Sequence, residues 1–246
     1  MLRPLWQKIT RFNPAFGLLL VLAFGIPRFI IALNANVTGN YGLIAIVFLL
    51  MWIAPFILLT KNGRRSIGLK KPTNYYWLLY SFFIGIGFCA LMYFAATLFY
   101  DHTLSNWFVY ISKSYTASGK VIPASEKLIY FIIFAATAIT FSPIGEELFY
   151  RGVAHGGFAT GLGERRASIA DSTAFALTHL AHFGIVYISG TWHFFFVPAL
   201  LWVIFMFVAS RLFFLCKEKS GSLAGAVICH ASYNLAMTYF IFYYIL

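Results

Sequence analysis

Residues 128–150 read LIYFIIFAATAITFSPIGEELFY, and this stretch decides the fold class, because a long apolar run ends in two adjacent carboxylates. A helix needs roughly 20 predominantly apolar residues to cross a bilayer, and the stretch supplies them. A charged side chain at membrane depth costs at least about 2.5–3.5 kcal/mol on insertion scales, so Glu146 and Glu147 require a reason. The stretch therefore predicts a transmembrane helix with a candidate site at its end.

The composition extends this prediction to the whole chain. Of its 246 residues, 61% are hydrophobic and 10% are charged, whereas soluble domains are about 45–50% apolar and about 25% charged. A soluble core could not hide so many apolar groups, so the bilayer must act as the solvent. Strand-like alternation is absent, so helices must satisfy the backbone in lipid. We expect an all-α, polytopic helical bundle that forms one integral membrane domain over residues 1–246.

Seven apolar segments are long enough to cross the bilayer as helices. The first carries Pro27 and Arg28 near its far end, and the fourth and fifth contain charged or histidine side chains. No internal repeat is visible. The predicted spans are Pro14–Leu33, Tyr41–Thr60, Tyr75–Tyr100, Leu128–Tyr150, Ile169–Ile188, Phe194–Phe214 and Ser222–Leu246.

The basic residues predict the orientation of the bundle. The net charge is +11, and the loops on one side hold only Lys113, Lys120 and Lys127, all in one long connection. The positive-inside rule therefore places the N-terminus in the cytosol and the C-terminus outside. Topology thus accounts for the charge, and we expect membrane lipid rather than nucleic acid as a partner. The basic residues assigned to the cytosolic side are Arg3, Lys8, Arg11, Lys61, Arg64, Arg65, Lys70, Lys71, Arg151, Arg165, Arg166, Arg211, Lys217 and Lys219.

The two carboxylates of the fourth span point in different directions on a helix. Pro143 removes a backbone donor and should kink the helix just before them. Glu147 and Arg151 are four residues apart, so they share a face and can form an ion pair. Glu146 points about 100° away and needs another partner. The structural alternative is an acidic pair that ends a helix near the lipid headgroups.

Two further spans carry polar side chains inside apolar surroundings. In the fifth, His179 lies about ten residues inside the span, and Phe175, one turn earlier, can pack against its ring. In the seventh, His230 and Asn234 are four residues apart and share a helix face. Hydrogen bonding between helices, without chemistry, is the alternative for each of these residues.

Depth joins the three spans. At the helical rise per residue, Glu146, His179 and His230 lie roughly 8, 15 and 12 Å from the predicted cytosolic edges of their spans. A carboxylate, an imidazole and further donors in one layer can activate water and stabilise an oxyanion. Two histidines and a glutamate could also bind zinc. Because no His-Glu-x-x-His helix is present, the spacing does not require a metal.

The three motifs resemble those of the CPBP (Abi-type) intramembrane proteases, a family that includes the type II CAAX prenyl endopeptidase. The family pattern is Glu-Glu-x-x-x-Arg, then Phe-x-x-x-His, then His-x-x-x-Asn or similar, on separate membrane helices. The motif-bearing resemblance covers about residues 125–240, whereas the first three spans match only in character. The matching residues are Glu146 and Glu147 with Arg151, Phe175 with His179, and His230 with Asn234.

The resemblance implies an intramembrane endopeptidase with a site near the cytosolic face. Glu146 would activate water that His179 shares, and His230 and Asn234 would stabilise the tetrahedral oxyanion. Family members have often been labelled metalloproteases, and zinc would be held by Glu146, His179 and His230. We favour the metal-free glutamate mechanism, which requires no cofactor.

The resemblance also assigns supporting residues. Glu147 and Arg151 would form a pair that orders the helix end, next to Phe175 of the second motif. His182 and His155 fall outside the pattern, and we predict no role for them.

The substrate and the cellular setting follow less directly from the sequence. Eukaryotic family members remove the last three residues after a prenylated cysteine, whereas many bacterial relatives act on peptides. We expect a peptide or protein substrate, lipidated or not, and a prokaryotic plasma membrane. A reentrant segment within Gly152–Arg166 is an alternative to a simple loop. The competing functions are a proton-coupled transporter and a catalytically silent immunity or peptide-binding protein.

Overall fold

The computed structural model describes residues 1–116 and 122–246, and these residues are almost entirely helical, as the sequence predicts. Lys120, which contributed to the predicted orientation, lies outside the described residues. Within these two described stretches, seven long helices are joined by short elements. The long helices are α2 (Pro14–Thr38), α3 (Gly42–Leu58), α5 (Tyr76–Tyr100), α7 (Lys127–Glu146), α8 (His155–Thr178), α9 (Phe196–Ser220) and α10 (Leu223–Phe240). The short elements are α1 (Pro4–Gln7), α4 (Lys61–Ser66), α6 (Trp107–Ser112), the π-helical segments η1 (Glu147–Ala154) and η3 (Ile241–Ile245), the 3₁₀ turn η2 (His179–Ala181), and the strands β1 (Ile185–Ile188) and β2 (Thr191–Phe194).

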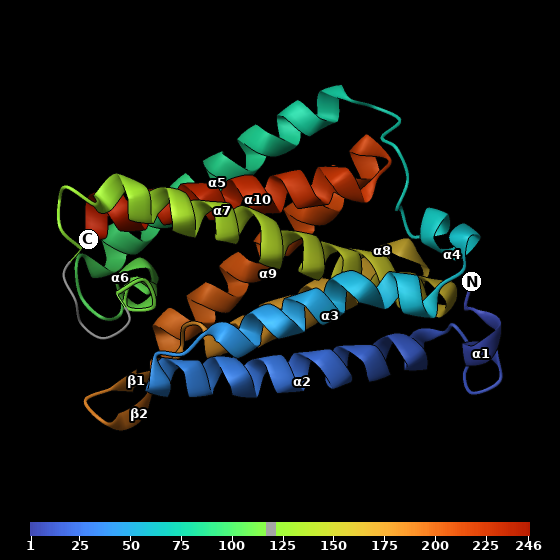
Figure 1. Ribbon diagram of the computed structural model, residues 1–246, viewed down its shortest axis with the longest axis horizontal. Coiled ribbons are helices and arrows are strands. Elements are labelled where there is room, and N and C mark those ends of the chain that lie inside the picture. The colour runs from blue at the N-terminus through green and yellow to red at the C-terminus, as the bar shows by residue number, and fades with distance from the viewer. Residues whose placement is uncertain (117–121) are drawn as a thin grey trace.

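The long helices lie side by side along the long axis of the molecule (Figure 1). Helix α10 packs against α5, α7 and α9, while α2 packs against α8, and α3 against α7. The N-terminus, α1 and α4 lie at one end, which we call the N-terminal end. The C-terminus, α6 and the two strands lie at the opposite end, which we call the hairpin end. The packing surfaces of α7 and α10 thus bring their polar residues into the interior of the bundle.

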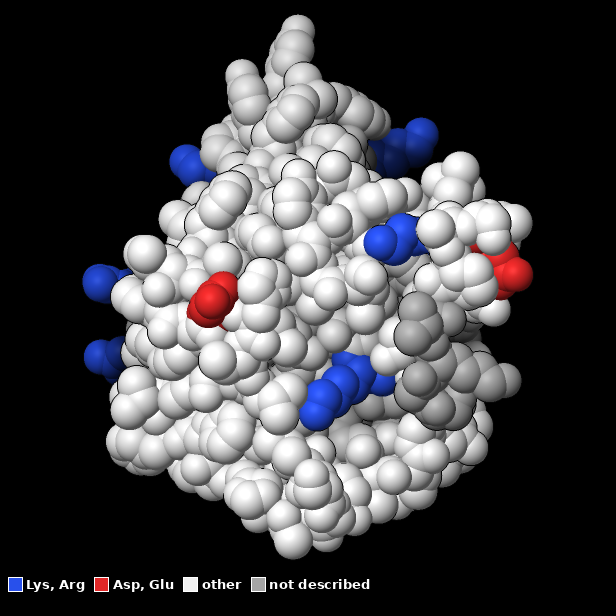
Figure 2. All heavy atoms as spheres, turned by 90° about the vertical axis from the view of Figure 1, so that its left-hand side faces the viewer, with Lys and Arg blue, Asp and Glu red and all other residues white. Residues whose placement is uncertain are grey.

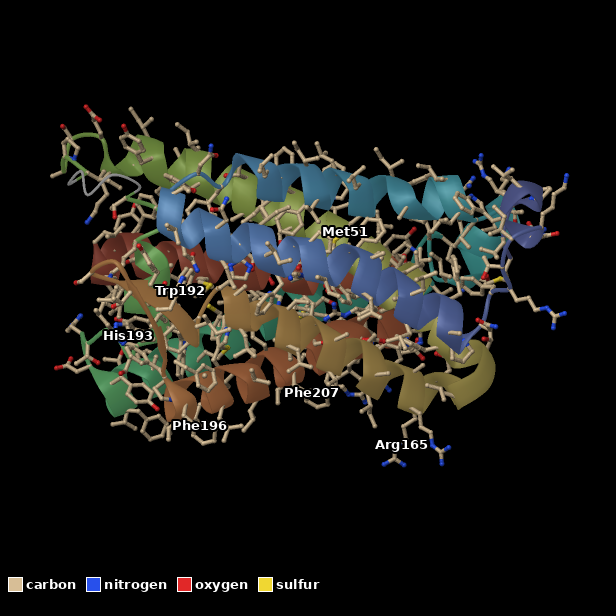
Figure 3. The ribbon with its side chains drawn as sticks, turned by 90° about the horizontal axis from the view of Figure 1, so that it is seen from below. Met51, Arg165, Trp192, His193, Phe196 and Phe207 are labelled. Carbon is tan, nitrogen blue, oxygen red and sulfur yellow. The ribbon has the colours of Figure 1, made fainter. Side chains whose placement is uncertain are left out.

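Four helical segments among the described residues are long and apolar enough to cross a membrane, and α3 is a shorter apolar helix. Large apolar side chains cover the outside of the bundle; Phe196 and Leu98, for example, are 68% and 80% exposed. Figure 3 shows Phe196 and Phe207 along α9 and Arg165 at the N-terminal end. An exposed surface of this kind suits a lipid environment. The chain is therefore an integral membrane protein, and the count of seven spans and the orientation stay predictions. The four segments are Pro14–Thr38, Tyr76–Tyr100, Lys127–Ala181 and Phe196–Ser220.

The end of the predicted fifth span is wrong. We predicted helix over Ile169–Ile188, but α8 ends at Thr178, and Ile185–Ile188 pairs with Thr191–Phe194 as an antiparallel hairpin. Ser189 and Gly190 have φ of 51° and 85° at the two-residue turn. A two-residue turn with positive φ at both positions matches the twist of an antiparallel pair, and β-branched residues favour strands. The described chain outside this short hairpin remains largely helical, so the prediction of a helical bundle rather than a barrel is unaffected.

The glycine-containing segment Gly152–Arg166 is helical rather than an irregular loop. It contains the end of η1 and the start of α8, and Gly163, with φ of 73°, breaks α8 into two helical parts. A positive φ at this position is accessible to glycine at little cost. The part of α8 after this break carries Phe175 and leads into His179 at the start of η2.

Close contact between α3 and α7 positions the end of α7. A Cβ atom on Gly145 would lie 2.7 Å from the Phe48 carbonyl oxygen, so only glycine permits this approach. The indole Nε1 of Trp52 donates a hydrogen bond of 2.8 Å to the Phe141 carbonyl oxygen. These contacts fix α7 against α3 immediately before Glu146.

Candidate active site

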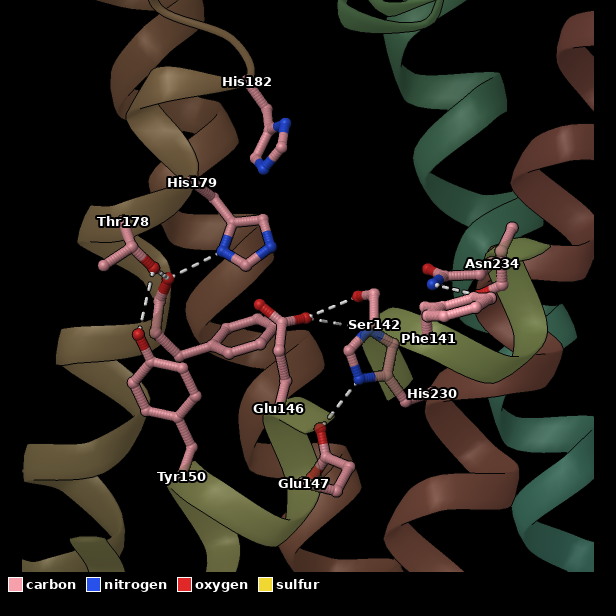
Figure 4. Close-up of polar contacts among 12 residues, drawn as sticks. Phe141, Ser142, Glu146, Glu147, Tyr150, Thr178, His179, His182, His230 and Asn234 are labelled. Atoms are coloured by element: carbon pink, nitrogen blue, oxygen red, sulfur yellow. Dashed lines mark hydrogen bonds and ion pairs between the residues drawn. The ribbon is translucent and has the colours of Figure 1, made fainter. Parts of the chain in front are cut away.

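Glu146 is the last residue of α7, and its carboxylate is completely buried and held on both oxygens. Oε1 forms an ion pair of 2.6 Å with Nη2 of Arg28. Oε2 accepts a hydrogen bond of 2.7 Å from the Ser142 hydroxyl and lies 3.7 Å from Nε2 of His230. Figure 4 shows the carboxylate between His179 on one side and Ser142 and His230 on the other. The acid that the sequence left without a partner therefore has one on each side.

Glu147 forms the ion pair that its spacing predicts. Its Oε2 lies 3.2 Å from Nε of Arg151, and both side chains are fully buried. Its Oε1 accepts a hydrogen bond of 2.8 Å from Nδ1 of His230. The Arg151 guanidinium stacks over the ring of Phe175, 4.3 Å from its centroid. Opposite charge and an aromatic face together compensate the burial of this cation.

The backbone changes from α to π geometry between the two acids. Helix α7 ends at Glu146 and the π-helical η1 begins at Glu147. Pro143, inside α7, has no N–H with which to continue the regular ladder. Short π segments inside helices are frequent at functional sites. Here the transition lies at the point where the two carboxylates diverge toward different partners.

His179 presents one ring nitrogen to the interior. Its Nδ1 lies 2.7 Å from the Phe175 carbonyl oxygen, which can only accept, so Nδ1 carries the proton. The neutral ring therefore has its lone pair on Nε2. Phe175 packs against the ring at 4.2 Å between centroids, as predicted from the one-turn spacing. The indole of Trp202 donates to the His179 carbonyl oxygen at 2.9 Å, which fixes this turn.

His230 lies directly between the two glutamates, while its partner in the motif lies farther along α10. The ring of His230 stacks on Phe213 with centroids 4.5 Å apart and an angle of 11°. Asn234 donates from Nδ2 to the Ala138 carbonyl oxygen of α7 at 3.0 Å. The structure thus brings Glu146, Glu147 and His230 into contact, whereas Asn234 forms hydrogen bonds with the backbone of α7 and with Thr238.

Sequence reasoning missed four residues around Glu146. Besides its ion pair, Arg28 donates from Nη1 to the Thr178 hydroxyl at 2.9 Å, and its Nη2 lies 3.3 Å from Nε2 of His182. Ser142 binds the carboxylate directly. The signal for Arg28 was present, because it is the sole charged residue of α2. Ser142 could have been found as the residue four positions before Glu146 on the same helix face.

His155 belongs to a separate cluster. Its Nδ1 lies 2.6 Å from Asp171 Oδ2 and its Nε2 lies 2.7 Å from Glu164 Oε2. Glu164 is mostly exposed, and Phe214 packs against the imidazole. These contacts place His155 apart from the residues around Glu146, and its lack of a role in the site stays a prediction.

An apolar cavity of about 520 Å³ lies next to the two motif histidines. Arg28, Ser142, His179 and His230 line it, and it extends past Asn234 toward the hairpin end. A second cavity of about 540 Å³ continues in that direction. Figure 2 views the hairpin end and shows few charged side chains on a mostly uncharged surface. The residues that line both cavities are Tyr41, Ile111, Ser114 and His182.

Residues 128–236 match the family model described as type II CAAX prenyl endopeptidase Rce1-like. This match covers 109 of the 246 residues and supports the CPBP/CAAX protease family that the motifs resemble. The matched segment contains every residue of the three motifs, and Arg28 lies outside it. No curated protein and no solved structure matches the chain. A protease family of this kind implies a peptide or protein substrate.

The motif residues do not form a metal site in the described part of the chain. No group of three histidine, cysteine or acidic side chains converges there as metal ligands do. Both oxygens of Glu146 are engaged by Arg28 and Ser142, and Nδ1 of His230 is engaged by Glu147. A zinc ion would also have to displace or tolerate the Arg28 cation at 2.6 Å from the same carboxylate. The groups around Glu146, as they are paired, therefore do not fit a zinc ion.

Proposed function

We propose that this protein is an intramembrane endopeptidase that hydrolyses a peptide bond with water activated by Glu146. The observation that carries the proposal is the placement of the Glu146 carboxylate opposite His179, next to an apolar cavity (Figure 4). A positioned carboxylate can accept a proton from water in the transition state. The unprotonated Nε2 of His179 can accept a hydrogen bond from the same water, which orients it for attack.

The reaction then proceeds in two steps. Water bound between Glu146 and His179 transfers a proton to the carboxylate as its oxygen bonds to the scissile carbonyl carbon, which gives a tetrahedral oxyanion. The protonated Glu146 then transfers that proton to the leaving nitrogen as the carbon–nitrogen bond breaks. The products are a new carboxyl group and a new amine, and the carboxylate is regenerated.

His230 and Asn234 supply the donors for the oxyanion in this proposal. His230 already donates from Nδ1 to Glu147, so a proton on Nε2 makes it an imidazolium that Glu147 stabilises. Asn234 uses its amide toward Ala138, and a second N–H of the same amide is available to the cavity. Donors aimed at the developing charge lower the barrier without reorganisation.

The substrate is a peptide or protein segment, and the mostly apolar cavity wall suits a hydrophobic or lipid-modified one. In this proposal Glu146 and His230 lie in the half of the bundle nearer the N-terminal end, because η1 continues α7 toward that end beyond Glu146 and α10 begins there at Leu223. With the orientation predicted from the basic residues, this is the cytosolic half of a prokaryotic plasma membrane.

The test is cleavage by the purified protein in detergent. The substrates are a reporter with a prenylated cysteine and three further residues at its end, and a panel of hydrophobic peptides, each with and without a chelator. We expect cleavage that survives the chelator and disappears in Glu146→Gln and His179→Ala. Loss of cleavage with the chelator would refute the metal-free mechanism. A binding function that persists in Glu146→Gln without any cleaved product would favour the silent immunity protein, and ion-coupled flux in vesicles would favour the transporter.

A further inference from the structure

Arg28 is the residue of the first long helix that reaches the candidate site. It lies outside residues 128–236, which match the family, and outside the three motifs. The guanidinium is 1% exposed and lines the cavity at the same time as it contacts Glu146. We propose that Arg28 is a positioning residue that holds Glu146 in register with His179. This proposal rests on the proposed function, because it assigns Arg28 a part in the same hydrolysis.

One guanidinium connects three separate elements. Nη2 pairs with Glu146 at the end of α7, and Nη1 donates to Thr178, the residue directly before His179. Nη2 also approaches His182, one turn later. Because the guanidinium is planar and rigid, these contacts fix the distance between the base and the histidine-bearing turn. Tyr150, whose hydroxyl lies 3.4 Å from the Thr178 hydroxyl, extends the network back to η1.

The contacts also set the proton positions of His182. A guanidinium can only donate, so Nε2 of His182 must accept, and the proton of the neutral ring lies on Nδ1. His182 therefore acts as a second anchor for Arg28 rather than as a second base. This gives a role to a histidine that the family motifs leave out.

Charge balance supports the assignment. Among the described residues, each buried glutamate of the site has one arginine: Glu147 has Arg151, and Glu146 has Arg28. A buried carboxylate without a cation would be strongly disfavoured in its charged form. The general base of the proposed mechanism must be charged before it accepts a proton, so Arg28 supplies the condition for catalysis.

Local packing brings Arg28 within reach. One turn earlier, a Cβ atom on Gly25 would lie 3.3 Å from the methyl carbon of Thr178, so α2 and α8 are in close contact at this level. The aromatic ring of Phe48 on α3 covers the guanidinium, 5.5 Å from its centroid to Cζ. Three helices thus enclose the side chain and leave it one orientation.

The test compares Arg28→Lys and Arg28→Ala with wild type in steady-state cleavage by the full-length purified protein. Lysine keeps the charge but cannot span the three partners. We expect kcat to fall on the order of 100-fold in Arg28→Lys, with KM nearly unchanged, because a misplaced catalytic group costs rate rather than binding. Added methylguanidinium should partly restore kcat in Arg28→Ala. Arg65→Ala, in the exposed α4, is the matched control and should retain full activity.

In steady-state cleavage, two results would overturn the proposal. One is wild-type kcat in Arg28→Lys; the other is an increase in KM alone, which would make Arg28 a substrate-binding residue. A thermal double-mutant cycle of Arg28→Met and Glu146→Gln tests the pair without any activity. Arg28→Met should lower the melting temperature in the wild-type background and much less in Glu146→Gln. Equal shifts in both backgrounds would refute the pairing, whereas coupling in a protein that cleaves nothing would refute the proposed hydrolysis and leave the pairing intact.

Discussion

Glu146 and Glu147 are neighbours in the sequence, and both are fully buried and paired with an arginine, yet their surroundings differ. The pair of Glu146 is long-range, and its arginine lines the cavity. The pair of Glu147 is local, and the ring of Phe175 covers its arginine. Arg28 therefore lines the cavity, whereas Arg151 does not.

Two acids one residue apart on the same helix thus have different proposed roles, one in catalysis and one in stabilising the fold. Consecutive residues on a helix point about 100° apart, so the two adjacent acids have different partners, and only the arginine of Glu146 lines the cavity. His230 connects them, because one ring nitrogen contacts Glu147 and the other lies near Glu146. We therefore propose that Glu146 acts in catalysis while Arg28 positions it, and that Glu147 and Arg151 support the fold. Substitutions can test this division.

The largest expected effect is on Glu146, the acid whose arginine lines the cavity. Glu146→Gln removes the general base, and the cleavage rate should fall about 10³-fold or more. The measurement is kcat for the best substrate of the peptide panel. Glu218→Gln, at an exposed position of α9, is the matched control and should leave kcat unchanged. Substantial activity in Glu146→Gln would transfer the role of base to another residue and end the distinction between the pairs.

The second effect is on the enclosed pair. Glu147→Gln leaves the Arg151 cation buried without its counter-charge, which should destabilise the fold by about 3–5 kcal/mol. The measurement is the melting temperature in detergent, which should fall. Adding Arg151→Met to the same chain removes the unpaired cation and should partly restore the melting temperature. If Glu147→Gln melted like wild type but lost cleavage, Glu147 would have a role in catalysis rather than in the stability of the fold.

A smaller effect is expected at the far wall of the cavity. Asn234→Ala removes one proposed oxyanion donor, and kcat should fall about 100-fold with little change in KM. The same substitution also removes the hydrogen bond to Ala138, so the melting temperature is measured in parallel. A change in stability with normal kcat would make Asn234 a helix-packing residue.

The smallest effect on activity is expected outside both pairs. His155→Ala removes two contacts to carboxylates near the break in α8, and stability should fall by about 1–3 kcal/mol. The kcat of the folded protein should equal that of wild type. A large loss of kcat at normal stability would show that the site extends to this cluster.

The sequence by itself determined the broad architecture and the motif residues. Its apolar content required a helical membrane protein, because only helices satisfy the backbone in lipid without strand partners. The cost of charge in an apolar span singled out Glu146, and the four-residue spacing predicted the Glu147–Arg151 pair, which the structure confirms. These inferences are local or compositional, so they need no knowledge of which helices touch.

Tertiary structure alone decided which groups meet. The partner of Glu146 is more than a hundred positions away, and no helical periodicity relates Arg28 to it. The hairpin after α8 also escaped prediction, because a short apolar run has the same composition as a strand or as the end of a buried helix. Contacts between distant segments depend on how helices pack, and packing here follows from close approaches such as Gly145 against Phe48, which only the folded chain reveals.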